Sequence, residues 1–215
     1  MVCTVKRNLR KSALICGSFL LVFSAAAADL SDPKAATKSV LEALKAKDES
    51  AVLATILIES ADHQPLAGAM AQVLVAGRRM ADAAAGRFGP AGDALGRGPV
   101  TPVDLPLVDQ AVVEIKDGVA DVLLPGQTIP LKFKRTDTGW RLMVTHFHGA
   151  APENMPRQLA LLRLTAGAMN EAATEIEQGR YATVEDAEAA IRQKMNFVLM
   201  RSLTATTVPT TSISD

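Results

Sequence analysis

Two histidines, His146 and His148, have the residue type and the spacing that could do chemistry. They stand two positions apart at the end of a predicted strand, so both side chains point to the same face of that strand. An imidazole exchanges protons near neutral pH and binds metal ions, and this spacing suits either role. A metal ion would need a further ligand, such as His63 or Asp121, and no pattern in the sequence brings these residues together.

A structural role is the commoner one for such a histidine pair. In that interpretation His146 is a hydrogen-bonded residue near the end of the sheet, and His148 lies in the turn that follows. His63, which precedes Pro65 at a helix start, is then exposed. We therefore predict no metal site, and we keep His146 and His148 as the candidate catalytic residues, with His146 as the acid–base group.

Other catalytic patterns are missing from the sequence. There is no glycine-flanked nucleophilic serine, no phosphate-binding loop and no paired-glycine turn typical of dinucleotide binding. Residues 86–98 are rich in glycine, but they follow a predicted helix and have no Lys-Ser or Lys-Thr ending, which indicates a linker. Both cysteines, Cys3 and Cys16, lie in the N-terminal leader, so the remaining chain has no thiol nucleophile or thiolate ligand. The sequence predicts no cofactor.

The first 28 residues have the pattern of a secretory signal peptide. Four basic residues lie between positions 6 and 11, an uncharged apolar run extends from Ser12 to Phe23, and small residues precede Asp29. We expect cleavage after Ala27 or Ala28 and an exported protein, periplasmic or extracellular. A retained membrane anchor is the alternative. The whole uncharged stretch from Ser12 to Ala28 has 17 residues, fewer than the ~20 strongly apolar residues of a spanning helix, so we expect no stable membrane span after cleavage.

The chain that follows the leader is mildly acidic. It keeps 19 of the 23 Lys and Arg residues and all 23 Asp and Glu residues, which is a net charge of −4. With one Trp and one Tyr, it lacks the basic face and the stacking aromatics of nucleic-acid binders, and we expect no nucleic-acid partner. The adjacent Arg78 and Arg79 fit a solvent-exposed helix face, on which Asp82 pairs with Arg78 four residues away.

Helical periodicity extends from about residue 33 to residue 85. Asp32 and Pro33 form a helix start, a second short apolar stripe follows Asp48, and a third helix begins near Pro65. Glycine and proline then dominate residues 86–106. This composition predicts a loop, whose role the sequence does not show.

Four strands are predicted in the next part of the chain, at residues 111–115, 119–124, 129–135 and 140–147. Asp117-Gly118 between the first two is a strong hairpin signal, because the turn needs a positive φ that glycine adopts freely. Short connections between all four strands imply an antiparallel sheet. On the last strand Trp140 and Leu142 share one face, and we expect Trp140 in the core.

Helical periodicity returns from Pro156 to Gly179 and again from Thr183 to about Ser202. The residues expected to face inward are Leu159, Leu162, Ala166, Met169, Ala173 and Ile176 on the first helix and Val184, Ala187, Ile191, Met195, Val198 and Leu199 on the second. Thr183 and Asp186 are spaced as in a capping box. Residues 204–215 are rich in Thr and Ser without periodicity, which predicts a disordered tail.

The order of these elements resembles the NTF2-like superfamily, which includes SnoaL-like proteins and exported bacterial proteins of unassigned role. The resemblance rests on the first helix, with Val40-Leu41-Glu42-Ala43-Leu44 before Asp48, and on strands that end in Gly139-Trp140-Arg141-Leu142. It covers about residues 31–148. It implies an α+β fold in which N-terminal helices pack on a curved four-stranded antiparallel sheet, an NTF2-like cone with a pocket, here followed by a C-terminal helical pair.

The expected organisation is a signal peptide at 1–28, an NTF2-like domain at 29–148, a C-terminal helical extension at 149–203 and a disordered tail at 204–215. Fold alone assigns little function, because the superfamily contains isomerases, cyclases, hydrolases and non-catalytic binders. With no recognisable catalytic set, we favour a non-catalytic exported protein. It would bind a small hydrophobic ligand or a protein partner, a second copy in a homodimer included, through the cone pocket or the C-terminal helices. The alternative is a small cofactor-free isomerase or hydrolase that uses His146, so the question of enzymatic activity stays open.

Overall fold

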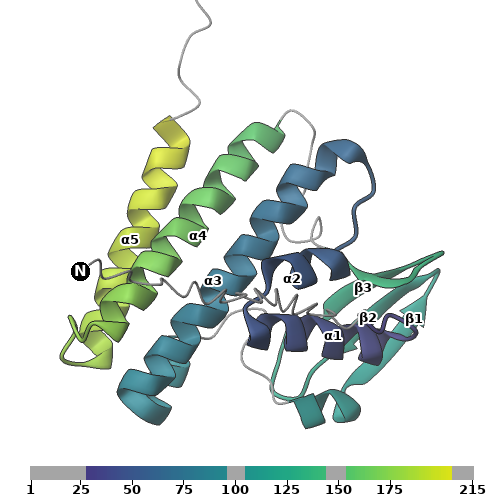
Figure 1. The fold of residues 1–215 in the computed structure, drawn as a ribbon, viewed down its shortest axis with the longest axis horizontal. Coiled ribbons are helices and arrows are strands. Elements are labelled where there is room, and N and C mark those ends of the chain that lie inside the picture. Colours follow the sequence, from purple (N-terminus) through teal and green to yellow (C-terminus); the bar gives the residue numbers. More distant parts are fainter. Residues whose placement is uncertain (1–27, 96–104, 144–153, 205–215) are drawn as a thin grey trace, which may run out of the picture.

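The structure, a computed structural model, describes residues 28–95, 105–143 and 154–204. It is an α+β fold with a four-stranded antiparallel sheet at one end and three long helices that extend away from it (Figure 1). The expected α+β class and antiparallel sheet are therefore confirmed. Residues 1–27 of the leader, residues 205–215 of the C-terminal tail and both candidate histidines, His146 and His148, lie outside the described residues.

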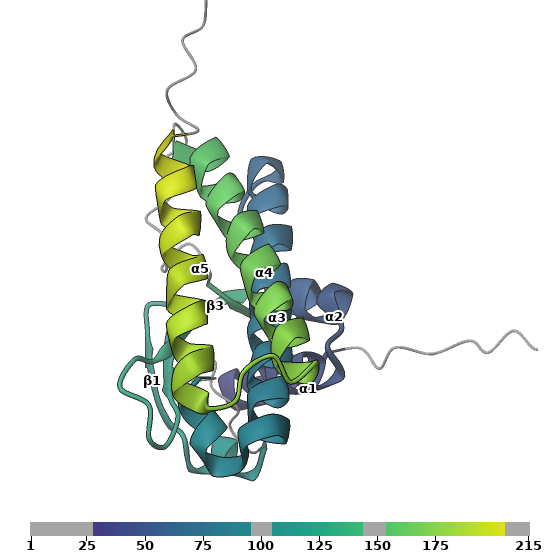
Figure 2. The same cartoon turned by 90° about the vertical axis from the view of Figure 1, so that its left-hand side faces the viewer.

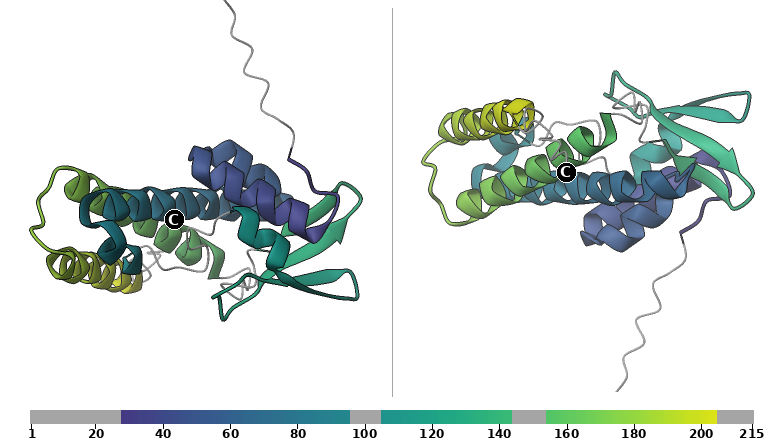
Figure 3. Two further views of the ribbon diagram at one scale, coloured as in Figure 1. Left: turned by 90° about the horizontal axis from the view of Figure 1, so that it is seen from below. Right: turned by 90° about the horizontal axis from the view of Figure 1, so that it is seen from above.

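Two short helices, α1 (Pro33–Ala46) and α2 (Glu49–Thr55), pack against the sheet (Figure 3). The Asp32 carboxylate caps α1, because it accepts hydrogen bonds from the amides of Lys34 and Ala35 at 2.8 and 3.0 Å. Both helices begin where the sequence predicts a start.

The sheet is a meander whose strands are hydrogen-bonded in chain order: β1 (Val112–Lys116), β2 (Val119–Leu123), β3 (Leu131–Thr136) and β4 (Gly139–Leu142). The β1–β2 turn has positive φ at both central residues, 51° at Asp117 and 76° at Gly118, as the hairpin signal predicts. Within the described residues β4 ends at Leu142, and residues 144–147 of the expected strand lie outside the described part.

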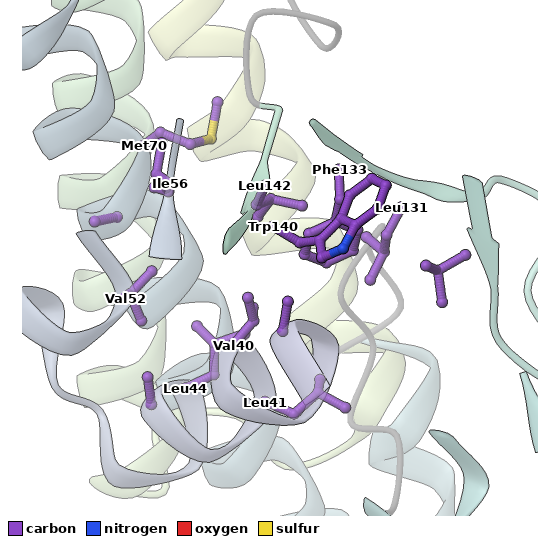
Figure 4. Close-up of a cluster of buried hydrophobic side chains, with 14 of the residues drawn as sticks. Val40, Leu41, Leu44, Val52, Ile56, Met70, Leu131, Phe133, Trp140 and Leu142 are labelled. Carbon is purple, nitrogen blue, oxygen red and sulfur yellow. The ribbon is translucent and has the colours of Figure 1, made fainter. Parts of the chain in front are cut away.

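The inner face of the sheet and the two short helices enclose the main core (Figure 4). Phe133 and Leu142 are almost fully buried from the sheet side, and Val40 and Val52 are fully buried from the helix side. Trp140 is 6% exposed among them, so its expected place in the core is confirmed. Burying these large side chains is the main force that holds the helices on the sheet.

The third helix, α3 (Gln64–Phe88), begins near the sheet and continues well beyond it. It runs through Gly86, and the 3-10 turns η2 (Gly89–Ala94) and η3 (Leu105–Gln110) follow. The expectation of loop throughout 86–106 is therefore wrong at both ends of that range. A single glycine inside a helix costs about 1 kcal/mol, which packing along the rest of a long helix offsets.

Two further helices, α4 (Met155–Glu177) and α5 (Val184–Thr204), form an antiparallel hairpin beside α3 (Figure 1). The expected capping box is confirmed: the Thr183 amide donates to Asp186 Oδ2, and the Asp186 amide donates to Thr183 Oγ1, both at 3.2 Å. Among the described helices, none is long and apolar enough to cross a membrane.

The inward face of α5 departs from its prediction at one position. Leu199 is 52% exposed, and Ser202, at 4%, takes the buried place instead. The step from Val198 to Ser202 is four residues, which keeps both on the same side of the helix. Ser202 can be buried because its hydroxyl donates a 2.7 Å hydrogen bond to the Leu199 carbonyl.

Candidate functional site

The residues that the sequence singles out for chemistry do not meet in the described structure. His146 and His148 lie outside it. His63 is half-buried rather than exposed, because its ring packs at the start of α3 where the Nδ1 atom is shielded from solvent. Asp121 lies in β2 and pairs with Lys132 of β3 at 2.6 Å. Among the described residues, no three His, Cys, Asp or Glu side chains are placed to hold a metal ion.

The described residues do form a groove, between α4 and α5. Its volume is about 610 Å³. Figure 2, in which α5 faces the viewer, shows the two helices that form its walls. The lining residues are Arg163, Leu164, Gly167, Ala168, Glu171 and Glu175 of α4, Tyr181 of the connection, and Ala190, Gln193, Lys194, Phe197, Val198 and Arg201 of α5.

The side chains of α4 explain why a groove opens on this side. Its larger apolar residues Leu162 and Ile176 are nearly fully buried, in clusters that include residues of α3. On the side of the groove, α4 contributes the small residues Gly167 and Ala168, and α5 contributes Ala190. A Cβ atom at Gly167 would meet no other atom within 4 Å, so the small residues leave real space between the helices.

One end of the groove is closed by a cluster of partnered charges around Lys194. Its ammonium group lies 2.8 Å from Glu171 Oε1 and 3.2 Å from Glu175 Oε2. The Tyr181 hydroxyl donates a hydrogen bond to Glu175, and Arg180 lies 3.1 Å from the same carboxylate. The Glu175 side chain is only 12% exposed. Because these groups satisfy one another, the cluster favours a structural role over acid–base catalysis.

The protonation states of this cluster follow from its geometry. Burial and the hydrogen bond to Glu175 raise the pKa of Tyr181 to about 12. The Tyr181 hydrogen bond lowers the pKa of Glu175, against the opposing effect of burial. Burial disfavours the charge on Lys194, but hydrogen bonds to Glu171 and Glu175 outweigh it and raise the pKa of this lysine. At neutral pH the cluster therefore contains a neutral tyrosine beside charged carboxylate and ammonium groups.

The other end of the groove is apolar and basic. Arg163 and Arg201 also line the groove. Since α4 and α5 are antiparallel and Lys194 lies opposite Glu171, each of these arginines lies about two helical turns from that ion pair, toward the same end of the helix pair. Phe197, which is 65% exposed, lines the groove near them. Within the described part of the chain, the Arg163 side chain makes no hydrogen bond or ion pair.

Sequence reasoning missed this groove, although part of the signal is present. Gly167, Ala168 and Ala190 are small residues on facing helices, a pattern that also occurs in tightly packed helix pairs. Lys194 occupies a position between the inward residues Ile191 and Val198, where an apolar residue would be usual. A lysine on the inward stripe was the available indication that carboxylates lie opposite it.

Comparison with protein-family models, with curated proteins and with solved structures finds no match to this chain.

Proposed function

We propose that this chain is an exported, non-catalytic binding protein whose α4–α5 groove holds a small amphipathic molecule with an anionic head group. The observation that carries the proposal is the groove itself, about 610 Å³ between an apolar floor and a basic end. Small-molecule sites are concave, largely apolar and about 300–1,000 Å³ in volume, with a few polar groups that orient the ligand.

The apolar part of the ligand would lie over Gly167 and Ala168, between Leu164 and Phe197. An alkyl or aromatic group placed there would cover Phe197, which is 65% exposed without a ligand. Covering apolar surface stabilises a complex by about 25 cal/mol for each Å² removed from water. The small floor residues fit this role because they leave the space that the ligand fills.

The head group would lie at Arg163. Residues 154–170 and 189–204 contain no Asp or Glu, so no carboxylate of these helix segments competes for its guanidinium. The charge of Lys194 at the opposite end is already matched by Glu171 and Glu175. A guanidinium binds carboxylate or phosphate through two parallel hydrogen bonds, which favours an anionic head over a cationic one.

Calorimetric titration of the chain from residue 29 with decanoate, decylamine and decyl maltoside tests this proposal. We expect saturable binding of decanoate, weaker binding of the neutral maltoside and none of the amine. Gly167→Leu fills the floor of the groove without meeting an existing atom and should abolish binding. Gly68→Leu, a helical glycine of α3 with equally open surroundings, is the matched control and should leave binding unchanged.

The Arg163→Gln variant separates the two parts of the ligand. It should weaken decanoate binding about tenfold, as expected for the loss of one charged hydrogen-bonded pair, and should not change maltoside binding. Equal affinity of all three probes, or binding that survives Gly167→Leu, would overturn the proposal.

Two further expectations belong to this proposal. The NTF2-like arrangement of residues 31–148 is supported by two helices that precede a four-stranded antiparallel meander and pack on it. Export is supported by the order of charge, apolar run and alanines in residues 1–28. N-terminal sequencing of secreted material should give Ala28 or Asp29 as the first residue, whereas an intact Met1 on a membrane-bound form would contradict export and cleavage.

A further inference from the structure

We propose that the open end of the α4–α5 hairpin docks on an anionic lipid surface. The open end is formed by residues 155–163 of α4 and residues 195–201 of α5, which lie at the same end of the antiparallel pair (Figure 1). This inference goes beyond the groove ligand and does not depend on it.

The first observation is the exposure of three large apolar side chains within four consecutive positions of α5. Phe197, Met200 and Leu199 are 65%, 63% and 52% exposed. At 100° per residue, Phe197 and Met200 share one side of the helix, while Leu199 lies on another. Val198 and Ser202 are the buried residues of this segment, so the three exposed apolar side chains lie outside its buried side, where a surface helix is usually polar. Scattered exposed apolar residues are normal, but a cluster of this kind marks an interaction surface.

The second observation is the charge of the same end. Residues 154–170 and 189–204 contain five basic residues and no acidic one, whereas Glu171, Glu175, Glu177, Glu185, Asp186 and Glu188 lie toward the connection between the helices. Of the basic residues, Arg192 pairs with Glu188 at 2.7 Å and Lys194 pairs with Glu171. Arg157, Arg163 and Arg201 also lie at the open end, and the side chains of all three are exposed.

Exposed apolar side chains at the same end of a helix pair as exposed arginines can bind an anionic membrane surface. The apolar groups enter the boundary between head groups and acyl chains, and the guanidinium groups stay at the level of the phosphates.

A second copy of the chain fits this end less well. A two-fold axis through Phe197 would set the basic segment of one α5 against the same basic segment of the other. Like charges across an interface oppose association. An anionic lipid surface supplies the opposite charge, which favours it over a second copy of the chain.

Vesicle co-sedimentation with the chain from residue 29 tests the inference. We expect binding to phosphatidylcholine vesicles in which about one third of the lipid is phosphatidylglycerol, and at least tenfold weaker binding to pure phosphatidylcholine. Raising the salt from about 0.05 to about 0.5 M should release the protein, because salt screens the arginines. Equal binding to both vesicles, or no binding to either, would overturn the inference.

The variants avoid the groove, so that the two proposals fail separately. The double variant Leu199→Ser/Met200→Ser changes no groove-lining residue and should lower the affinity for anionic vesicles at least tenfold. Ile129→Ser, which removes an apolar side chain of equal exposure (62%) beyond the sheet, is the matched control and should have no effect. Arg157→Gln should weaken binding several-fold, and Lys45→Gln on α1 should not.

Two outcomes would replace the lipid surface with another occupant. Concentration-dependent dimers in sedimentation velocity that Leu199→Ser/Met200→Ser abolishes, in a protein that does not bind vesicles, would assign the surface to a second copy. Vesicle binding that Gly167→Leu abolishes while Leu199→Ser/Met200→Ser preserves it would show that the groove extracts single lipids and that the helix end does not dock. Either result overturns the inference.

Discussion

The backbone amide of Trp140 donates a hydrogen bond of 2.9 Å to the carbonyl oxygen of Leu30. This bond ties the segment before α1 to the first residues of β4, and Leu30 is itself only 8% exposed. The Ser39 hydroxyl adds a second tie, a 3.0 Å hydrogen bond to the carbonyl of Asp29. The residues that follow the predicted cleavage site are therefore part of the fold.

Replacing Gly139 with alanine should disrupt the packing of Leu30 against the start of β4. Gly139 has a φ of +112°, and a Cβ atom there would lie 2.7 Å from the Cβ of Leu30, closer than real Cβ atoms approach. Backbone strain and the clash together should cost about 2–4 kcal/mol in the free energy of unfolding, measured by urea denaturation. Gly126→Ala has positive φ but nothing within 4 Å, so it should lose only about 1 kcal/mol. Equal losses of unfolding free energy in the two variants would mean that the contact with Leu30 does not contribute to the cost of Gly139→Ala.

Gly118→Val should destabilise the β1–β2 hairpin by about 1–3 kcal/mol. Gly118 follows Asp117 in a turn with φ values of 76° and 51°, and a β-branched residue at positive φ is strained. Asp117→Asn is the control, because asparagine accepts the left-handed conformation and should leave the thermal midpoint nearly unchanged. An unchanged midpoint for the valine variant would show that the turn differs in solution.

The elements that sequence reasoning predicted correctly are those with local causes. The Asp117-Gly118 turn and the Thr183 and Asp186 capping box need only neighbouring residues, and both are present. The predictions were wrong where tertiary contacts determine which residues are buried. Leu199 is the more apolar choice for the inward stripe of α5, but tertiary packing orients the helix so that Ser202 is buried and Leu199 is exposed.

The candidate site could not be predicted for the same reason. The groove exists because the large apolar residues of α4 pack with residues of α3, whereas the small residues Gly167 and Ala168 line the space next to α5. No local sequence pattern indicates which face of a helix packs against which other helix. The cluster around Lys194 likewise joins residues from two helices and their connection. The histidine pair at 146 and 148 is a candidate by residue type and spacing, and neither of these indicates which residues the fold brings next to the pair.

Trp140→Ala should cost about 3–5 kcal/mol in the free energy of unfolding, a large part of the stability of a domain. Trp140 is 6% exposed and packs with Phe133 and Leu142 in the main core (Figure 4). As the only tryptophan, it reports its own surroundings by fluorescence, and the native emission should be blue-shifted and inaccessible to iodide. Emission like that of free tryptophan, with a variant that unfolds at the same denaturant concentration, would place this side chain at the surface.

Tyr181 should ionise near pH 12 in the folded protein, two units above its ordinary value of 10.0. Burial and the hydrogen bond to Glu175 raise its pKa, so its contribution to stability is fully present below pH 10 and is lost as the pH rises through about 12. Because the chain has a single tyrosine, phenolate absorbance at 295 nm reports this group alone. Glu175→Gln removes the charge that holds the proton and should move the midpoint toward 10, while Glu188→Gln, distant on α5, should not. A wild-type midpoint near 10 would mean that the hydrogen bond between Tyr181 in the connection and Glu175 of α4 does not form in solution.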